Sequence, residues 1–124
     1  MQKVLFENNP ILKLTFEFSL QIITYCEVLQ DGKKYVIGNQ LLRSGTSIGA
    51  NAMEAQNAES KADFIHKMKI AAKETSETLY WLLLCERSDS YRFDEKLKEQ
   101  LEEINRILSR IISSSKGGLK NIVS

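Results

Sequence analysis

Proline, histidine and cysteine are scarce in this sequence of 124 residues, which has one proline, one histidine and two cysteines. One proline and six glycines leave little room for long loops or for a linker, so we expect a single domain over residues 1–124. The single histidine, His66, excludes metal sites that need a histidine from each of two helices of one chain. We therefore expect no bound metal and no cofactor.

Neither sign of charge predominates, since 17 lysines and arginines oppose 16 aspartates and glutamates and give a net charge of +1. A dedicated nucleic-acid-binding protein usually has a strongly basic balance or face, so this balance argues against that function. Long apolar runs are absent too, because Lys13 and Glu17 interrupt the apolar stretch that follows Pro10. The first nine residues lack the features of a signal peptide. We expect a cytoplasmic protein that does not enter the membrane.

Apolar residues recur at the three-four spacing of amphipathic helices along four segments, and no segment has the alternation of a strand. The expected helices cover residues 10–29, 36–58, 60–87 and 94–113. Short connections make sequential helices antiparallel neighbours. The sequence therefore predicts an all-α, up-down-up-down four-helix bundle. The last helix is expected to fade out within residues 113–118, with tails at residues 1–9 and 118–124.

Local signals predict where these helices begin and end. Asn9 and Pro10 predict an N-cap followed by proline at the first helical position. The pair Asp31–Gly32 predicts a turn that ends the first helix. Ser60–Asp63 has the spacing of a capping box, and Asp94 is expected to cap the last helix.

Two glycines, Gly45 and Gly49, stand four residues apart within the second expected helix. Glycine in a helix interior costs about 1 kcal/mol relative to alanine. The usual compensation is a second backbone that packs very close to the glycine. The segment therefore predicts tight packing between helices and does not point to a reaction.

The first expected helix has more apolar surface than one buried stripe requires. A second, offset stripe consists of Leu12, Phe16, Leu20 and Ile23. Each helix of a single four-helix bundle has one face in water, so this stripe predicts burial against another subunit. The alternatives are that this helix is the most central element, or that the N-terminal tail covers it.

The segment 35–55 resembles the second-helix signature of the four helix bundle protein family, and the segments 60–65 and 70–82 resemble its third helix. That family includes proteins encoded by intervening sequences within bacterial large-subunit ribosomal RNA genes. The resemblance implies a four-helix bundle that forms homopentamers, with a biochemical role that is largely unassigned. A related, strongly basic branch works with the reverse transcriptase of diversity-generating retroelements, which implies nucleic-acid binding as an alternative function.

Polar residues within the family-like segments form the first candidate site. They are Arg43, Asn51, Glu54 and Glu77. We favour a network of hydrogen bonds between helices that fixes their register, because buried polar groups need partners. The alternative is a ligand pocket. Counting equal distances from the turn near Glu59 predicts that Arg43 pairs with Glu77 or with Glu74.

Basic residues at the end formed by the first and third connections are a candidate weak anion-binding rim. They are Lys33, Lys34, Arg87 and Arg92. Oligomerisation would repeat such a rim around an axis and amplify its charge. Five carboxylates lie near the same end of the chain's fold: Asp31, Glu86, Asp89, Asp94 and Glu95. We therefore expect a solvated end of mixed charge.

Residues suited to covalent chemistry lack their usual partners. Ser44 and Ser47 are accompanied neither by a nucleophile elbow nor by a histidine. Cys26 and Cys85 lie in expected helices, where they are best interpreted as small buried residues. We expect no enzymatic activity. The leading hypothesis is a self-assembling scaffold or adaptor in a ring-like homo-oligomer; the others are a weak RNA- or DNA-binding accessory protein and a ligand-binding bundle.

Overall fold

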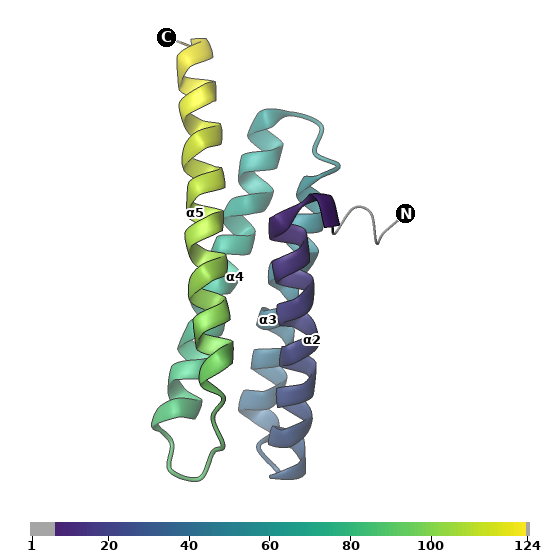
Figure 1. Ribbon diagram of the computed structural model, residues 1–124, viewed down its shortest axis with the longest axis vertical. Coiled ribbons are helices and arrows are strands. Elements are labelled where there is room, and N and C mark those ends of the chain that lie inside the picture. The colour runs from purple at the N-terminus through teal and green to yellow at the C-terminus, as the bar shows by residue number, and fades with distance from the viewer. Residues whose placement is uncertain (1–6, 124) are drawn as a thin grey trace.

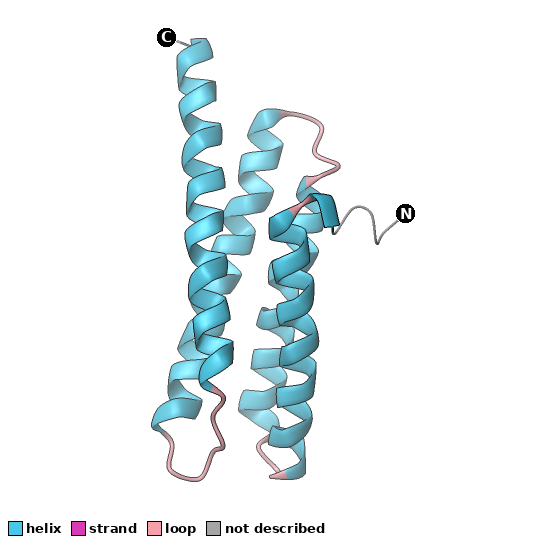
Figure 2. Ribbon diagram, viewed as in Figure 1, coloured by secondary structure: helices cyan, strands magenta, loops and turns pink. Residues whose placement is uncertain are grey.

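The computed structural model describes residues 7–123 and is an all-α four-helix bundle (Figures 1 and 2). Its helices are α2 (Pro10–Asp31), α3 (Tyr35–Ala55), α4 (Lys61–Arg87) and α5 (Glu95–Val123). They alternate in direction, and residues 7–123 contain no strand. The fold class predicted from the spacing of apolar residues is confirmed.

Each helix packs against two of the other three. The neighbouring pairs are α2–α3, α3–α4, α4–α5 and α5–α2. Across the diagonals, in the part of the chain that the structure describes, no Cα atoms of α2 and α4 approach within 8 Å of each other. In Figure 1, α2 and α3 lie on one side of the bundle and α4 and α5 on the other. The outer surfaces of these two sides therefore face away from each other.

The ends of α2 and α4 follow the expected local signals, with one difference. Ser60 accepts a hydrogen bond from the Asp63 amide at 3.0 Å, and Asp63 accepts one from the Glu59 amide at 3.3 Å. Pro10 begins α2 as predicted. The Asn9 side chain, however, does not cap the helix; it donates to Gln56 Oε1 at 3.2 Å. The first helix is thus tied to the end of α3.

The C-terminus of α2 is a Schellman motif in which Lys33 takes the place usual for glycine. Its φ of 63° is left-handed, whereas Gly32 has a φ of −84°. The Lys34 amide donates to the Leu29 carbonyl at 2.8 Å, and the Lys33 amide donates to the Gln30 carbonyl at 2.9 Å. The predicted turn is present, but its glycine stands one residue too early to relieve the strain.

The prediction that the last helix fades out within residues 113–118 is wrong. The helix α5 continues to Val123, and Figure 1 shows it projecting past the loop between α3 and α4. Serine and glycine lower helix propensity, but they do not block the helix as proline does. Ile111 and Ile112 still pack against the core just before this segment. Residues 118–123 are thus helical; residues 1–6 of the expected N-terminal tail lie outside the described part.

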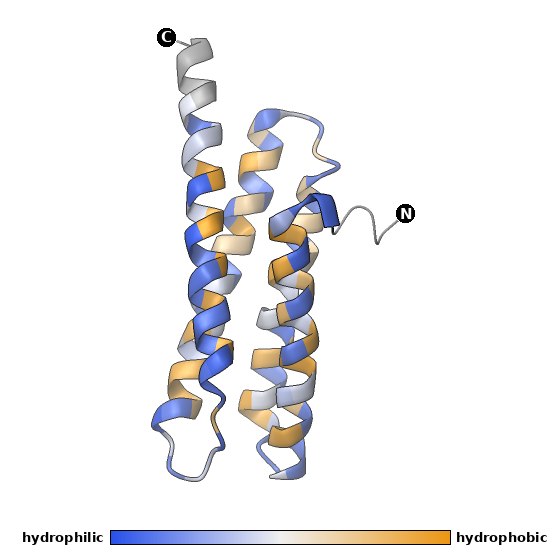
Figure 3. Ribbon diagram, in the orientation of Figure 1, coloured by the Kyte–Doolittle hydropathy of each residue, from blue (hydrophilic) through white to orange (hydrophobic). Residues whose placement is uncertain are grey.

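The core is built from one buried stripe on each helix. Its largest fully buried side chains include Phe18, Ile22, Leu41, Ile48, Met68, Leu82, Leu97, Leu101, Ile104 and Leu108. Figure 3 shows α5 coloured hydrophobic on the edge that faces its neighbours and hydrophilic on its outer edge. Gly45 and Gly49 of α3 allow the close approach that their spacing predicted. A Cβ atom at Gly49 would lie 3.2 Å from Thr15 Oγ1 on α2.

Candidate functional site

An exposed apolar surface lies along the outer groove between α2 and α3; we call it the α2–α3 face. Its members are Phe16, Leu20 and Ile23 of α2 with Tyr35 and Leu42 of α3. Two depressions mark this groove. One of about 80 Å³ is lined by Phe16, Gly49 and Met53, and the other, of about 250 Å³, by Tyr35 and Leu42. The α2–α3 face therefore includes exposed apolar residues of both helices.

One member of the predicted second stripe, Leu12, lines the smaller depression but adds almost no exposed area to this surface. Leu12 is only 1% exposed and packs within the core of its own bundle. Phe16, Leu20 and Ile23 are 45%, 51% and 43% exposed. Leu12 lies near the start of α2, where the stripe turns toward the core, so it is corrected to a core residue. The other three remain candidates for an interface.

The ion pair predicted for Arg43 is confirmed. The Arg43 guanidinium pairs with Glu77 through Nη2, and its Nη1 lies 3.4 Å from Glu74 Oε2. Glu77 also accepts a hydrogen bond from Trp81 Nε1 at 3.1 Å. The Arg43 side chain is half exposed, so the pair is a partly solvated bridge between α3 and α4. Counting equal numbers of residues from the α3–α4 turn therefore predicted the partner of Arg43 correctly.

The four polar candidates do not form one network. Asn51 Nδ2 donates to the Ser47 carbonyl at 2.8 Å within α3. Glu54 lies 3.5 Å from Lys67 Nζ, which makes a separate bridge to α4. Arg43 and Glu54 are eleven positions apart along α3, a rise of about 16 Å, so no direct contact joins them. The predicted network is therefore two independent bridges between α3 and α4.

A buried hydrogen bond between α3 and α4 was not anticipated from the sequence. Thr78 Oγ1 lies 2.9 Å from Ser44 Oγ, and both residues are fully buried. Thr78 Oγ1 also donates to the Glu74 carbonyl at 2.7 Å. A buried hydroxyl pair is stable only when each partner is satisfied. Ser44 and Thr78 lie at core positions of amphipathic helices, which is the signal that could have identified them.

Tyr25 and the two cysteines form a buried group near the α4–α5 loop. The Tyr25 hydroxyl donates to the Arg92 carbonyl, and burial raises its pKa above the usual range. Burial, and then the nearby Cys85, raise the pKa of Cys26 to about 11; burial also raises the pKa of Cys85. Both thiols are therefore protonated and weakly nucleophilic at neutral pH. The prediction of small buried residues is confirmed.

These two cysteines cannot form a disulfide in this fold. Cys26 lies on α2 and Cys85 on α4, which are diagonal helices with no Cα atoms within 8 Å in the described residues. A disulfide needs Cα atoms that are usually less than about 7 Å apart. The Cys26 thiol instead donates to the Gly38 carbonyl at 3.4 Å. Its role is to pack α2 against α3.

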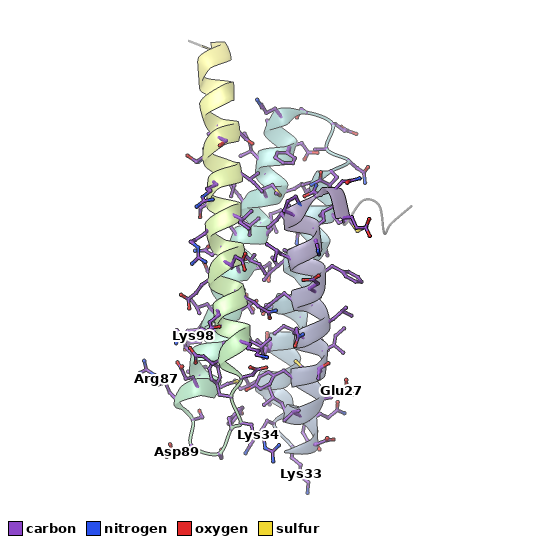
Figure 4. The ribbon with its side chains drawn as sticks, viewed as in Figure 1. Glu27, Lys33, Lys34, Arg87, Asp89 and Lys98 are labelled. Carbon is purple, nitrogen blue, oxygen red and sulfur yellow. The ribbon has the colours of Figure 1, made fainter. Side chains whose placement is uncertain are left out.

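The candidate anion rim is only partly assembled. Lys34 and Arg92 line a common depression of about 450 Å³, but Asp31 lines it as well. The Lys34 ammonium lies 5.2 Å from the centroid of the Tyr91 ring. Figure 4 shows Arg87 at the end of α4, apart from Lys33 and Lys34 at the α2–α3 loop. This end of the bundle thus has mixed charge, and the four cations do not form one continuous rim.

Two further features bear on the class of protein: clusters of metal ligands and helices able to cross a membrane. Within the described residues, no three His, Cys, Asp or Glu side chains gather as a metal site would require. In that same part of the chain, no helix is long and apolar enough to cross a membrane. The molecule combines a helical bundle, bridges between helices and an exposed apolar face. These features define a four-helix bundle protein with a surface suited to association.

The chain belongs to the 23S rRNA-intervening sequence protein family, which it matches over residues 7–112. It is similar to a solved structure from Bacteroides thetaiotaomicron, described as a protein of unknown function from the S23 ribosomal protein family. The two are 42% identical with a TM-score of 0.78, over 82% of this chain and 97% of that chain. Comparison with curated proteins gave no match. The family resemblance inferred from helices α3 and α4 is confirmed.

Proposed function

We propose that this protein is a non-enzymatic helical bundle that assembles with copies of itself and acts as a scaffold or adaptor. The observation that carries the proposal is the α2–α3 face, where Phe16, Leu20 and Ile23 are each more than two-fifths exposed. Soluble monomers rarely expose contiguous apolar surface of this kind, and such surface usually marks an interaction site.

The family resemblance suggests five copies in the assembly. A closed ring of five uses the same two different surfaces at every junction, because an odd ring cannot be built from self-complementary contacts alone. The α2–α3 face would then supply one of these surfaces to each junction. The self-assembly would present identical copies of the remaining surface around one axis, which is what a scaffold requires.

Substitution on the α2–α3 face tests this proposal. Leu20→Glu places a charge at the centre of the face without touching the core, because Leu20 is 51% exposed. We expect light scattering after size exclusion to give an oligomer for the unsubstituted protein and a smaller species for this variant. Circular dichroism should give the same helix content for both.

Val36→Glu is the matched control. Val36 is an apolar residue of α3 that is 77% exposed and lines neither depression of the α2–α3 face. We expect this variant to keep the mass of the unsubstituted oligomer. Equal loss of mass in both variants would contradict an interface at the α2–α3 face, and a monomeric unsubstituted protein would contradict self-assembly itself.

A further inference from the structure

The charges of this nearly neutral chain are segregated, with an acid-free surface on the side opposite the α2–α3 face. On α4, every exposed position from residue 61 to residue 80 lacks a carboxylate. These positions are Lys61, Ala62, His66, Lys69, Lys73, Ser76 and Tyr80. On α5, no aspartate or glutamate follows Glu103, while Arg106, Arg110 and Lys116 are all exposed. The overall charge of +1 conceals this separation.

Antiparallel packing brings these two cationic stretches together. Lys98 of α5 pairs with Glu86 of α4 at 3.1 Å, which fixes the register of the two helices. Counting the same number of residues from that pair along each helix places Lys116 of α5 level with Met68 of α4, which precedes Lys69. Lys116 lowers the pKa of Lys69, because a second positive charge nearby disfavours the protonated form of the lysine. Two like charges are therefore held side by side on an exposed surface.

Four carboxylates that border this surface on α3 and α4 already have partners. Glu74 and Glu77 of α4 turn toward α3 and pair with Arg43. Asp63 accepts the hydrogen bond that closes the cap of α4. Glu54 pairs with Lys67. Glu102, which lines the α4–α5 groove beside Ser76 and Asn105, and Glu103 remain exposed about one turn before Arg106. The cations at positions 69, 73, 110 and 116 lie farther along the two helices, where the exposed positions have no carboxylate, and an external anion would neutralise them.

An aromatic ring and small polar groups accompany the cations. Tyr80 continues the exposed stripe of α4 that contains Lys69 and Lys73, and its side chain is 57% exposed. It packs edge-on against Trp81, with ring centroids 5.4 Å apart. Exposed aromatic rings beside cations serve as platforms for unpaired bases, and hydroxyl and amide groups such as those of Ser76 and Asn105 bind phosphate or sugar oxygens.

We infer that the outer surface of α4 and α5 binds the phosphate backbone of single-stranded nucleic acid, with Tyr80 stacking on a base. The cations at Lys69, Lys73 and Lys116 contact phosphates, and Arg106 and Arg110 extend this track along α5. A membrane surface fits less well, because Tyr80 is the one large exposed apolar residue among the described parts of these two helices. This inference uses none of the residues of the α2–α3 face, on which the proposed self-assembly depends.

Fluorescence anisotropy with labelled oligouridine and oligothymidine of about 20 nucleotides tests the inference. We expect binding at about 50 mM salt that weakens steeply toward about 200 mM, as contacts with phosphates require. Lys69→Gln combined with Lys116→Gln should lower the affinity at least about tenfold. It should also reduce the slope of log K against log salt by about 0.7 for each phosphate that is no longer neutralised.

The matched control is Lys33→Gln combined with Lys34→Gln, which removes the same charge at the mixed end of the bundle. We expect this variant to change the affinity less than about twofold, since it leaves the α4–α5 surface intact. Both pairs of substitutions should leave the thermal midpoint unchanged or slightly raised. An equal loss of affinity in the two double variants would overturn the inference, because it would show a response to net charge alone.

Tyr80→Ala separates stacking from attraction by charge. It should weaken binding to the single strands about fivefold or more, and leave binding to a duplex of the same length unchanged. Absence of binding at low salt would overturn the inference, as would binding to phosphatidylserine vesicles without binding to the oligonucleotides.

The Leu20→Glu variant should still bind the oligonucleotides, with lower apparent affinity because it presents fewer binding sites in one particle. Failure of self-assembly and failure of this surface to bind nucleic acid are therefore distinguishable.

Discussion

Gly45 of α3 packs so closely against Ile22 of α2 that a Cβ atom on the glycine would lie 3.0 Å from both Cγ atoms of the isoleucine. Ile22 is fully buried, so it has little room to move away. The cost of a glycine within a helix is therefore offset by the close approach of two helices. The sequence predicted this approach from the spacing of the small residues, but could not identify the partner side chain.

Substitution of Gly45 should destabilise the bundle in proportion to the size of the new side chain. We expect Gly45→Leu to lower the free energy of unfolding by about 3 kcal/mol or more in urea titrations, because the core cannot accommodate it. Gly45→Ala should bring no gain, since its contact with Ile22 offsets the better helix propensity of alanine. The control is Gly38→Ala, whose nearest contact would be an ordinary 3.6 Å to Leu29 Cβ. It should be neutral or stabilising, and an equal gain at both glycines would contradict the packing argument.

The bridge between Arg43 and Glu77 should contribute little net stability. Because the arginine side chain is half exposed, we expect a coupling energy below about 1 kcal/mol. A double-mutant cycle of Arg43→Met and Glu77→Gln measures this coupling directly. Glu77 keeps its hydrogen bond from Trp81 when Arg43 is replaced, so the single arginine variant should remain folded. Strictly additive effects would show that the pair does not fix the register of α3 and α4.

Replacement of Lys33 by glycine should stabilise the protein. Lys33 has a φ of 63°, a left-handed conformation that costs an L-residue about 1 kcal/mol or more. Lys33→Gly should therefore raise the free energy of unfolding by about 1 kcal/mol. Gly32→Ala is the matched control, because Gly32 has an ordinary φ and its added Cβ atom meets nothing closer than 3.6 Å. A loss of stability in Lys33→Gly would contradict the assignment of the Schellman motif.

Alkaline pH should weaken the fold through the buried thiol of Cys26. Its pKa is about 11 in the folded protein, against 9.0 for a cysteine thiol in water, so between these values the unfolded chain binds fewer protons. Stability is therefore intact below about pH 9 and falls as the pH rises toward about 11, by about 2 to 3 kcal/mol for this group. Tyr25 acts in the same direction, since burial also raises its pKa.

Urea titrations at about pH 8 and about pH 10.5 measure this dependence. The variant Cys26→Ala should lose less stability between the two pH values than the unsubstituted protein does. Its lower starting stability, which follows from poorer packing, does not affect this difference. The same loss in both proteins would mean that Cys26 ionises as easily in the folded chain as in the unfolded one.

Features that depend on local spacing were predictable from the sequence. The helix periods, the cap at Ser60 and the pairing of Arg43 with Glu77 all follow from counting along one helix or across one short turn. The length of α5 was not predictable in this way, because helix propensity alone does not determine where a packed helix ends. The burial of Leu12 depends on how α2 is rotated against its neighbours.

The candidate surfaces could not be predicted from the sequence, because they depend on how the helices lie side by side. A net charge of +1 suggested a balanced surface, whereas lateral pairing of α4 and α5 gathers cations from residues as far apart as Lys69 and Lys116. The pattern His66, Lys69, Lys73, at helical spacing and without an acid on the same stripe, was the available signal. The candidate rim that includes Lys33 and Arg87 is not continuous, because residues near the same end of a bundle can point in different directions.

Native mass spectrometry of the unsubstituted protein tests self-assembly through the α2–α3 face most directly, because it counts the copies of the 14.2 kDa chain in one particle. We expect a single dominant particle of five chains at micromolar concentration, which Leu20→Glu dissociates and Val36→Glu leaves intact. A dominant monomer, or a particle whose mass Leu20→Glu does not change, would contradict it.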